Sequence, residues 1–143
     1  MKAKNVFKAE FPSRSVNEGF ARAAVAAFVS QLDPTLDELG DIRTAVSEAV
    51  TNCIVHAYPD TYGPIRLRVR LGEDGEVEIT VKDRGVGIED VERARTPLFT
   101  TGGDERSGMG FTIIESFMDS LRVKSAPGRG TTVTMRRRIA ARH

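Results

Sequence analysis

With 143 residues the chain has the length of one compact domain and is too short for two domains with separate cores. Its 21 basic and 20 acidic residues leave a formal net charge of +1, which excludes a general attraction to nucleic acid or membranes. The single cysteine allows no internal disulfide, and no apolar stretch has the length of a signal peptide or membrane span. We therefore expect one soluble, cytoplasmic domain over residues 1–143.

The first elements are a strand and a helix. Apolar and polar residues alternate over 5–11, which predicts a strand that ends at Pro12. Ser15 and Glu18 have the spacing of a capping box, in which two side chains satisfy the first free amides of a helix. An apolar helical period follows as far as Leu32 and predicts the first helix.

A second capping box, at Thr35 and Glu38, predicts a long helix that continues to Tyr58. Its apolar residues recur every three and four positions, the pattern of a buried face. Three polar residues lie four positions apart at the edge of that face: Glu48, Asn52 and His56. Residues four apart stack on one side of a helix, so a carboxylate and an amide oxygen face the same small volume. Taken alone, the helix favours a solvated edge over a functional site as the explanation of Glu48 and Asn52.

The middle of the chain predicts a β-hairpin. Residues 65–71 and 76–82 each alternate strictly and flank a turn at residues 72–75. The arginines of the first strand would face Glu76, Glu78 and Lys82 across the hairpin, which is ordinary surface pairing rather than a nucleic-acid site.

The last elements are shorter and follow two glycine-rich regions. They are a helix at 88–95, a Thr/Gly-rich segment at 96–107, a helix from Gly108 to Leu121, and strands at 122–125 and 131–136. Strands thus come as hairpins and helices as insertions, which predicts an α+β fold. We expect a two-layer sandwich with helices on one face of a mixed, mostly antiparallel sheet.

Two glycine motifs are candidate ligand-binding segments. Asp83-x-Gly85-x-Gly87 leaves a strand directly, so a fixed carboxylate lies beside backbone that can approach a ligand closely. Gly108-x-Gly110 opens a helix, whose free amides and positive dipole end can face a phosphate. Each motif is weak alone, and neither a Walker phosphate loop nor a dinucleotide fingerprint is present.

In combination, these features resemble the ATP-binding domain shared by histidine kinases, gyrase, Hsp90-type chaperones and MutL-type proteins, the Bergerat-type ATP-binding fold. The resemblance is closest to the anti-sigma factor serine kinases, and among them to the sporulation branch. It covers nearly the whole chain and is carried by five blocks: SEAVTN (47–52), VKDRGVGI (81–88), PLFTT (97–101), ERSGMGFTIIESFMD (105–119) and GTTV (130–133).

The resemblance implies a site for ATP or ADP with Mg²⁺. Asn52 would ligate the metal, Glu48 would act as the base toward a serine hydroxyl, and Asp83 would accept a hydrogen bond from the adenine amino group. Arg106 would meet the γ-phosphate, with a solvated loop arginine as the alternative. The other implied nucleotide-binding positions are Gly85, Gly87, Thr100, Thr101, Ser107, Gly108, Met109, Gly110 and Thr131.

The resemblance also implies partners. The protein would be a homodimer that binds and inhibits sigma F and uses Mg-ATP to phosphorylate an anti-anti-sigma factor on serine, with Arg14 and Arg22 in contact with these partners. Sigma F would prefer the ATP-bound state and the anti-anti-sigma factor the ADP-bound state. Direct binding to nucleic acid or membrane is not expected. Two alternatives stay open: a kinase of general stress regulation of the sigma B type, and a nucleotide-gated module that sequesters sigma without transferring phosphate.

Overall fold

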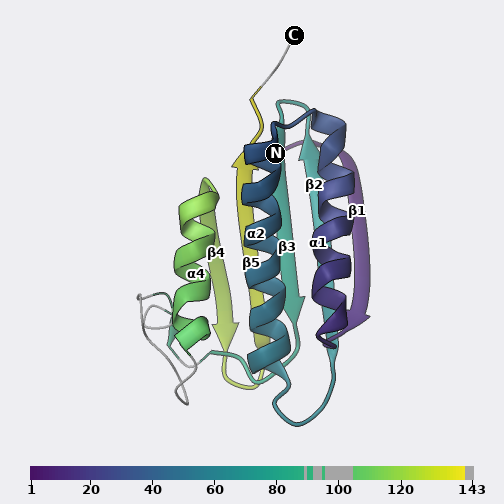
Figure 1. Ribbon diagram of the computed structural model, residues 1–143. Coiled ribbons are helices and arrows are strands. Elements are labelled where there is room, and N and C mark those ends of the chain that lie inside the picture. Colours follow the sequence, from purple (N-terminus) through teal and green to yellow (C-terminus); the bar gives the residue numbers. More distant parts are fainter. Residues whose placement is uncertain (89, 92–94, 96–104, 141–143) are drawn as a thin grey trace.

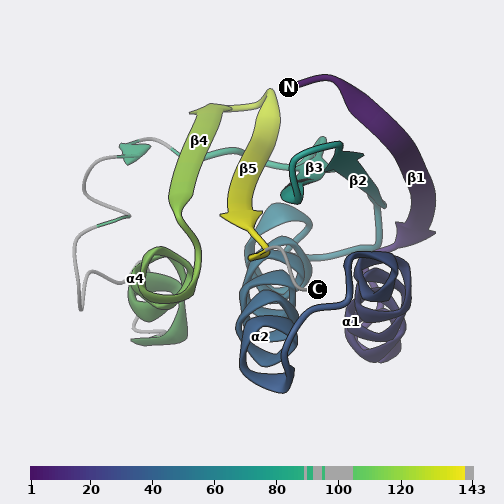
Figure 2. The same ribbon diagram turned by 90° about the horizontal axis from the view of Figure 1, so that it is seen from above.

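Figure 1 shows a computed structural model of the chain, in which residues 1–88, 90, 91, 95 and 105–140 are described, with only the helical backbone for 105–109. The elements form two layers, and Figure 2 shows the helices on one side of the sheet. The five strands follow the order β1-β2-β3-β5-β4. The predicted two-layer α+β class is confirmed. All pairings among these strands are antiparallel, so the sheet is not mixed.

The observed elements agree with the predicted order. The strands are β1 (Ala3–Pro12), β2 (Pro64–Gly72), β3 (Glu76–Asp83), β4 (Ser120–Ala126) and β5 (Gly130–Arg138). The helices are α1 (Val16–Val29) with a 3₁₀ turn (Ser30–Leu32), α2 (Leu36–Asn52) with a π-helical end (Cys53–Ala57), and α4 (Glu105–Phe117). The predicted hairpin is confirmed as β2 and β3, and its register places Arg70 opposite Glu78.

The core lies between the sheet and the helices. Alternate residues of β2 and β3 point toward the helices and are almost fully buried: Ile65, Leu67, Val69, Leu71, Val77, Ile79 and Val81. Helix α2 meets them with Ile42, Val46 and Val50, which are 0% exposed. Because α2 lies centrally and contacts both α1 and α4, its position fixes where Glu48 and Asn52 stand relative to the sheet.

The two predicted capping boxes differ. Thr35 accepts from the Glu38 amide at 3.1 Å while the Glu38 carboxylate accepts from the Thr35 amide at 2.8 Å, so the α2 capping box is confirmed. Ser15 makes no such bond, and the predicted α1 capping box is wrong although α1 starts where expected. The backbone of Ser15 is already helical, and Glu18 instead accepts a hydrogen bond from Ser47.

Three helix boundaries also differ from the sequence prediction. The α-helix ends at Asn52 and continues as a π-helix, whose wider turn no longer stacks residues four apart. The polar series therefore holds for Glu48 and Asn52 but is broken before His56. Helix α4 begins at Glu105 instead of Gly108 and ends before Leu121, which lies in β4. Of the helix predicted at 88–95, only residues 88, 90, 91 and 95 are described, and the Arg95 amide donates a hydrogen bond to the Val91 carbonyl at 3.1 Å.

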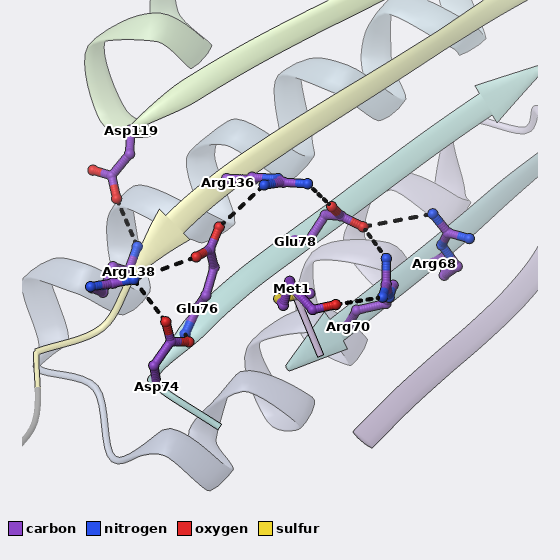
Figure 3. Close-up of polar contacts among 9 residues, drawn as sticks. All are labelled: Met1, Arg68, Arg70, Asp74, Glu76, Glu78, Asp119, Arg136 and Arg138. Carbon is purple, nitrogen blue, oxygen red and sulfur yellow. Dashed lines mark hydrogen bonds and ion pairs between the residues drawn. The ribbon is translucent and has the colours of Figure 1, made fainter. Parts of the chain in front are cut away.

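The face of the sheet away from the helices carries an ion-pair cluster around Glu78 (Figure 3). Glu78 is 4% exposed although no described helix covers it. Its oxygens contact Arg70 at 3.1 Å and Arg136 at 2.7 Å, from the two strands that flank β3, and Arg68 at 3.7 Å. The predicted cross-strand pairing at Glu78 is thus confirmed, and arginine side chains are what bury this carboxylate.

Candidate functional site

Several of the predicted site residues that the structure describes lie at one end of the sheet. Strands β3 and β4 end at this edge, β5 begins there, and helix α2 ends above it (Figure 1). Asp83 is the last residue of β3, Thr131 is the second residue of β5, and Asn52 is the last residue of α2. Segments distant in the sequence thus supply a carboxylate, backbone amides and a side-chain amide to one region.

Asp83 is held rigidly at the end of β3. It is 4% exposed, and its Oδ1 accepts hydrogen bonds from the Gly85 amide at 2.9 Å and the Thr131 amide at 3.2 Å. Burial raises the pKa of the neighbouring Cys53 thiol, and the charge of Asp83 and a hydrogen bond to it raise that pKa further. The thiol therefore stays protonated at neutral pH and can act as a donor to the carboxylate. A fixed, buried acceptor of this kind suits recognition of an amino group.

The glycines after Asp83 are required by close backbone approach. The Val86 amide donates to the Ala57 carbonyl at 2.9 Å, which draws this turn against the end of the π-helix. A Cβ on Gly85 would lie 2.1 Å from the Ala57 oxygen, and Gly87 has a φ of +77°. Side chains at either position would push the loop away, so these glycines allow close packing against neighbouring backbone, and their expected approach to a ligand stays a prediction.

Ser125 joins the ends of β4 and β5 to the loop after Asp83. Its hydroxyl accepts from the Ile88 amide at 2.7 Å and also contacts the Thr131 hydroxyl at 2.8 Å and the Gly130 carbonyl at 3.0 Å. Ser125 was not predicted as a site residue, because a serine near a strand end has no motif of its own. Its pairing with Thr131 across the β4–β5 hairpin is visible only once the register is known.

Asn52 carries an unsatisfied polar atom. Its Nδ2 is buried and has no hydrogen-bond partner among the described residues. A Cβ on Gly110 would lie 3.0 Å from this nitrogen and 3.1 Å from Oδ1, so the amide faces the backbone of α4. An asparagine amide offers Mg²⁺ a neutral oxygen ligand and offers a phosphate oxygen an N–H donor. The chemistry of Asn52 therefore fits a metal-bound phosphate, although no cluster of three acidic, His or Cys ligands occurs among the described residues.

Glu48 lies one turn before Asn52 on the same side of α2 and is partly buried. Its role as a base stays a prediction. Thr100 and Thr101 lie outside the described residues, and so do the side chains of Arg106, Ser107 and Met109. The backbone of Gly108 lies within α4, so the expectation that this motif opens the helix is wrong.

Arg14 and Arg22 lie on the loop before α1 and on α1 itself. The guanidinium of Arg14 lies over the Tyr62 ring at 5.4 Å, a cation–π contact. Arg22 pairs with Glu18 at 3.5 Å, and 44% of its side chain is exposed. Both arginines are exposed, Arg14 before the start of α1 and Arg22 in the middle of this helix.

Tyr58 is a second residue that the sequence analysis did not identify as functional. Its hydroxyl donates to the Pro64 carbonyl at 2.7 Å and accepts from the Arg84 amide at 2.8 Å. Burial raises the pKa of this hydroxyl, the Arg84 amide lowers it and the Asp83 charge raises it, with a net upward shift that keeps it protonated. Tyr58 thus contacts the residue between Asp83 and Gly85.

Comparison with known proteins identifies the class. A family profile described as a histidine kinase-like ATPase domain matches residues 11–137, and the chain belongs to that family. Among solved structures, the RsbU and RsbW domains of a Mycobacterium tuberculosis protein align with a TM-score of 0.70 and 21% identity, over 97% of this chain and 34% of that chain. The mycobacterial sensor histidine kinase MprB aligns with a TM-score of 0.58 and 18% identity, over 95% and 100% of the two chains. These two likenesses establish the fold alone.

Within this class the chain belongs to the family of the anti-sigma F factors. The anti-sigma F factor of Pasteuria penetrans is 57% identical over 140 residues, 96% of this chain and 93% of the relative. That of Caldanaerobacter subterraneus subsp. tengcongensis is 54% identical over 140 residues, 97% of each chain. The family recognised from the motifs is therefore confirmed over nearly the full length.

A membrane-spanning helix is also absent from the part of the chain that the structure describes. None of the helices there combines the length and the apolar character that crossing a bilayer requires.

Proposed function

We propose that this protein binds Mg-ATP at the edge formed by Asp83, Asn52 and the start of β5, and that it transfers the γ-phosphoryl group to a serine of an anti-anti-sigma factor. We propose further that it inhibits sigma F by binding it and that it acts as a homodimer. The observation that carries the nucleotide proposal is the buried Asn52 amide, whose Nδ2 has no partner among the described residues and faces Gly110.

The proposed division of labour follows from the chemistry of each residue. Asp83 accepts a hydrogen bond from the adenine amino group, while the packed turn at Gly85 and Gly87 lets the backbone lie against the base. Asn52 would hold the Mg²⁺ of Mg-ATP, and the metal would supply charge neutralisation for the transferring group. Phosphoryl transfer requires positioning more than covalent catalysis, so a few fixed groups suffice.

Glu48 is the proposed base. In the transfer the bond between the γ-phosphorus and the bridging oxygen breaks, a bond from the serine oxygen to phosphorus forms, and the serine proton passes to the Glu48 carboxylate. ADP leaves with the bridging oxygen. The four-residue spacing places Glu48 and Asn52 on one side of α2, so the proton acceptor and the phosphate-holding group share a face.

The test measures transfer of labelled phosphate from ATP to the anti-anti-sigma protein. We expect Glu48→Gln to reduce the rate by roughly 100-fold or more, the range of general-base catalysis, while ATP binding persists. The matched control is Asp37→Asn, the same chemical change on an exposed carboxylate at the far end of α2, which should transfer normally. If the unaltered protein binds ATP without transferring phosphate, the kinase proposal is wrong and a nucleotide-gated sequestering module takes its place.

A further inference from the structure

The loop that carries Arg14 is fastened to the loop between the π-helix and β2. Ser13 is 3% exposed and donates its amide to the Gly63 carbonyl at 2.9 Å, while the Gly63 amide donates to the Ser13 hydroxyl at 3.1 Å. Together with the contact of Arg14 and Tyr62, these reciprocal bonds join the two loops into one surface. A partner that displaces Arg14 therefore also displaces residues 58–64.

The second loop rests on the ring of Tyr58. A Cβ on Gly63 would lie 2.3 Å from a ring carbon of Tyr58, so the backbone at Gly63 lies directly against the aromatic ring. The Tyr58 hydroxyl also donates to the Pro64 carbonyl at 2.7 Å. Ring and hydroxyl together fix where this loop lies.

The same hydroxyl reaches the proposed nucleotide loop. It accepts from the amide of Arg84 at 2.8 Å, and the next amide, that of Gly85, donates to Asp83. Ala57, the residue before Tyr58, accepts from the Val86 amide at 2.9 Å. Residues 57 and 58 thus bind the turn after Asp83 on two sides. When this turn moves, the hydrogen bond to the Tyr58 hydroxyl must lengthen or the hydroxyl must move with the turn.

We propose that Tyr58 is a positioning residue that couples the surface around Arg14 to the nucleotide loop at Asp83. This inference rests on the proposed nucleotide and partner binding. One hydroxyl bonds both loops, so a ligand that displaces either loop changes the hydrogen bond made by the other, and binding at the two sites becomes energetically linked. The link is reciprocal: a partner on the Arg14 surface changes nucleotide affinity by the same factor as nucleotide changes partner affinity.

The variant Tyr58→Phe tests the link because it removes the hydroxyl and keeps the ring against Gly63. The quantity measured is the ratio of sigma F affinities with ATP and with ADP bound to the full-length protein. We expect this ratio to fall roughly 3- to 10-fold, which corresponds to one net hydrogen bond. A purely structural role would lower the melting temperature and leave the ratio unchanged.

Ser30→Ala is the matched control. It also removes one hydroxyl hydrogen bond to a backbone carbonyl, from Ser30 to Ala26 at 2.7 Å, at the opposite end of α1. We expect it to leave the ratio of affinities unchanged. If the ratio of affinities fell in both variants, a specific role for Tyr58 would be contradicted.

Amide hydrogen exchange provides a second measurement on the unaltered chain. Addition of sigma F to the ATP-bound protein should change exchange at residues 84–86, and Tyr58→Phe should weaken that response. An unchanged ratio in Tyr58→Phe, or no response at residues 84–86, overturns the inference and leaves the proposed function standing. Sigma F binding that is equally tight with ATP and with ADP in the unaltered protein overturns the coupling alone, whereas absence of any sigma F binding contradicts the proposed sigma binding as well.

Discussion

Two buried polar groups of this protein differ in what surrounds them. Glu78, on the open face of the sheet, has arginines at both carboxylate oxygens (Figure 3). Asn52, at the edge where α2 ends, has a buried Nδ2 with no hydrogen-bond partner among the described residues. Buried polar groups are costly unless they are paired, so the first group stabilises the fold, while the second costs stability that a bound ligand would recover.

The largest expected effect comes from Asn52→Ala. We expect the affinity for Mg-ATP to fall by about 100-fold or more, because even outer-shell partners of a metal contribute about 10- to 100-fold to its affinity. The free energy of unfolding without nucleotide should change by less than about 1 kcal/mol, since an unpaired amide nitrogen stabilises nothing. Calorimetric titration and urea unfolding measure the two quantities. An unchanged ATP affinity would refute the assignment of Asn52.

Gly85→Ala should destabilise the protein itself. Its Cβ would lie 2.1 Å from the Ala57 carbonyl oxygen, so the nucleotide loop must shift, at a cost of about 1–3 kcal/mol. Gly40→Ala on α2 is the control, since a Cβ there meets nothing within 4 Å and alanine favours helix by about 0.5–1 kcal/mol. Urea unfolding should therefore give opposite signs for the two variants, and equal signs would contradict the close packing described.

Glu78→Gln should cost about 1–2 kcal/mol of stability at pH 7, because the charge-assisted bonds to Arg70 and Arg136 are weakened. Burial raises the pKa of Glu78, but the hydrogen bond and charge of Arg136 and the charge of Arg70 outweigh it and hold the pKa below its ordinary value. A carboxyl whose pKa is lowered by folding stabilises the protein above its unfolded pKa, and this contribution is lost as the pH falls through the folded pKa.

The pH dependence separates Glu78 from other causes of acid sensitivity. The difference in unfolding free energy between Glu78→Gln and the unaltered protein should be full at pH 7 and should shrink below about pH 4.3, the ordinary pKa of glutamate. Urea unfolding at several pH values measures it. A difference that stays constant from pH 7 to pH 3 would exclude the arginine cluster as its source.

The smallest expected effect concerns the two capping boxes. Thr35→Ala should cost about 1 kcal/mol, since the Thr35 hydroxyl accepts from the Glu38 amide. Ser15→Ala should cost much less, because its side chain makes no bond at the start of α1. Thermal melts of the two variants measure the difference between a side chain that caps a helix and one that does not. Equal losses of stability in the two variants would contradict this difference.

The sequence predicts best what depends on local pattern. Strict alternation predicted the β2–β3 hairpin and the arginines that face Glu78, and the glycines after Asp83 indicated backbone that approaches another group closely. It failed at Ser15 because Glu18 has a competing partner, Ser47, which lies 29 residues away. Tyr58 and Ser125 were missed for the same reason, since their hydrogen bonds join separate segments and leave no periodic signal.

The topology also determines when the candidate site can form. The strands of hairpins β2–β3 and β4–β5 are joined by short turns. Strand β3 pairs with β5 although a long stretch of chain, which includes α4 and β4, separates them, and the hydrogen bond from the Thr131 amide to Asp83 spans 48 residues. Closing a long loop is entropically more costly than closing a turn, so the hairpins are favoured to assemble early and to dock later. During refolding, nucleotide binding would therefore report the docking of these hairpins and not the formation of either one.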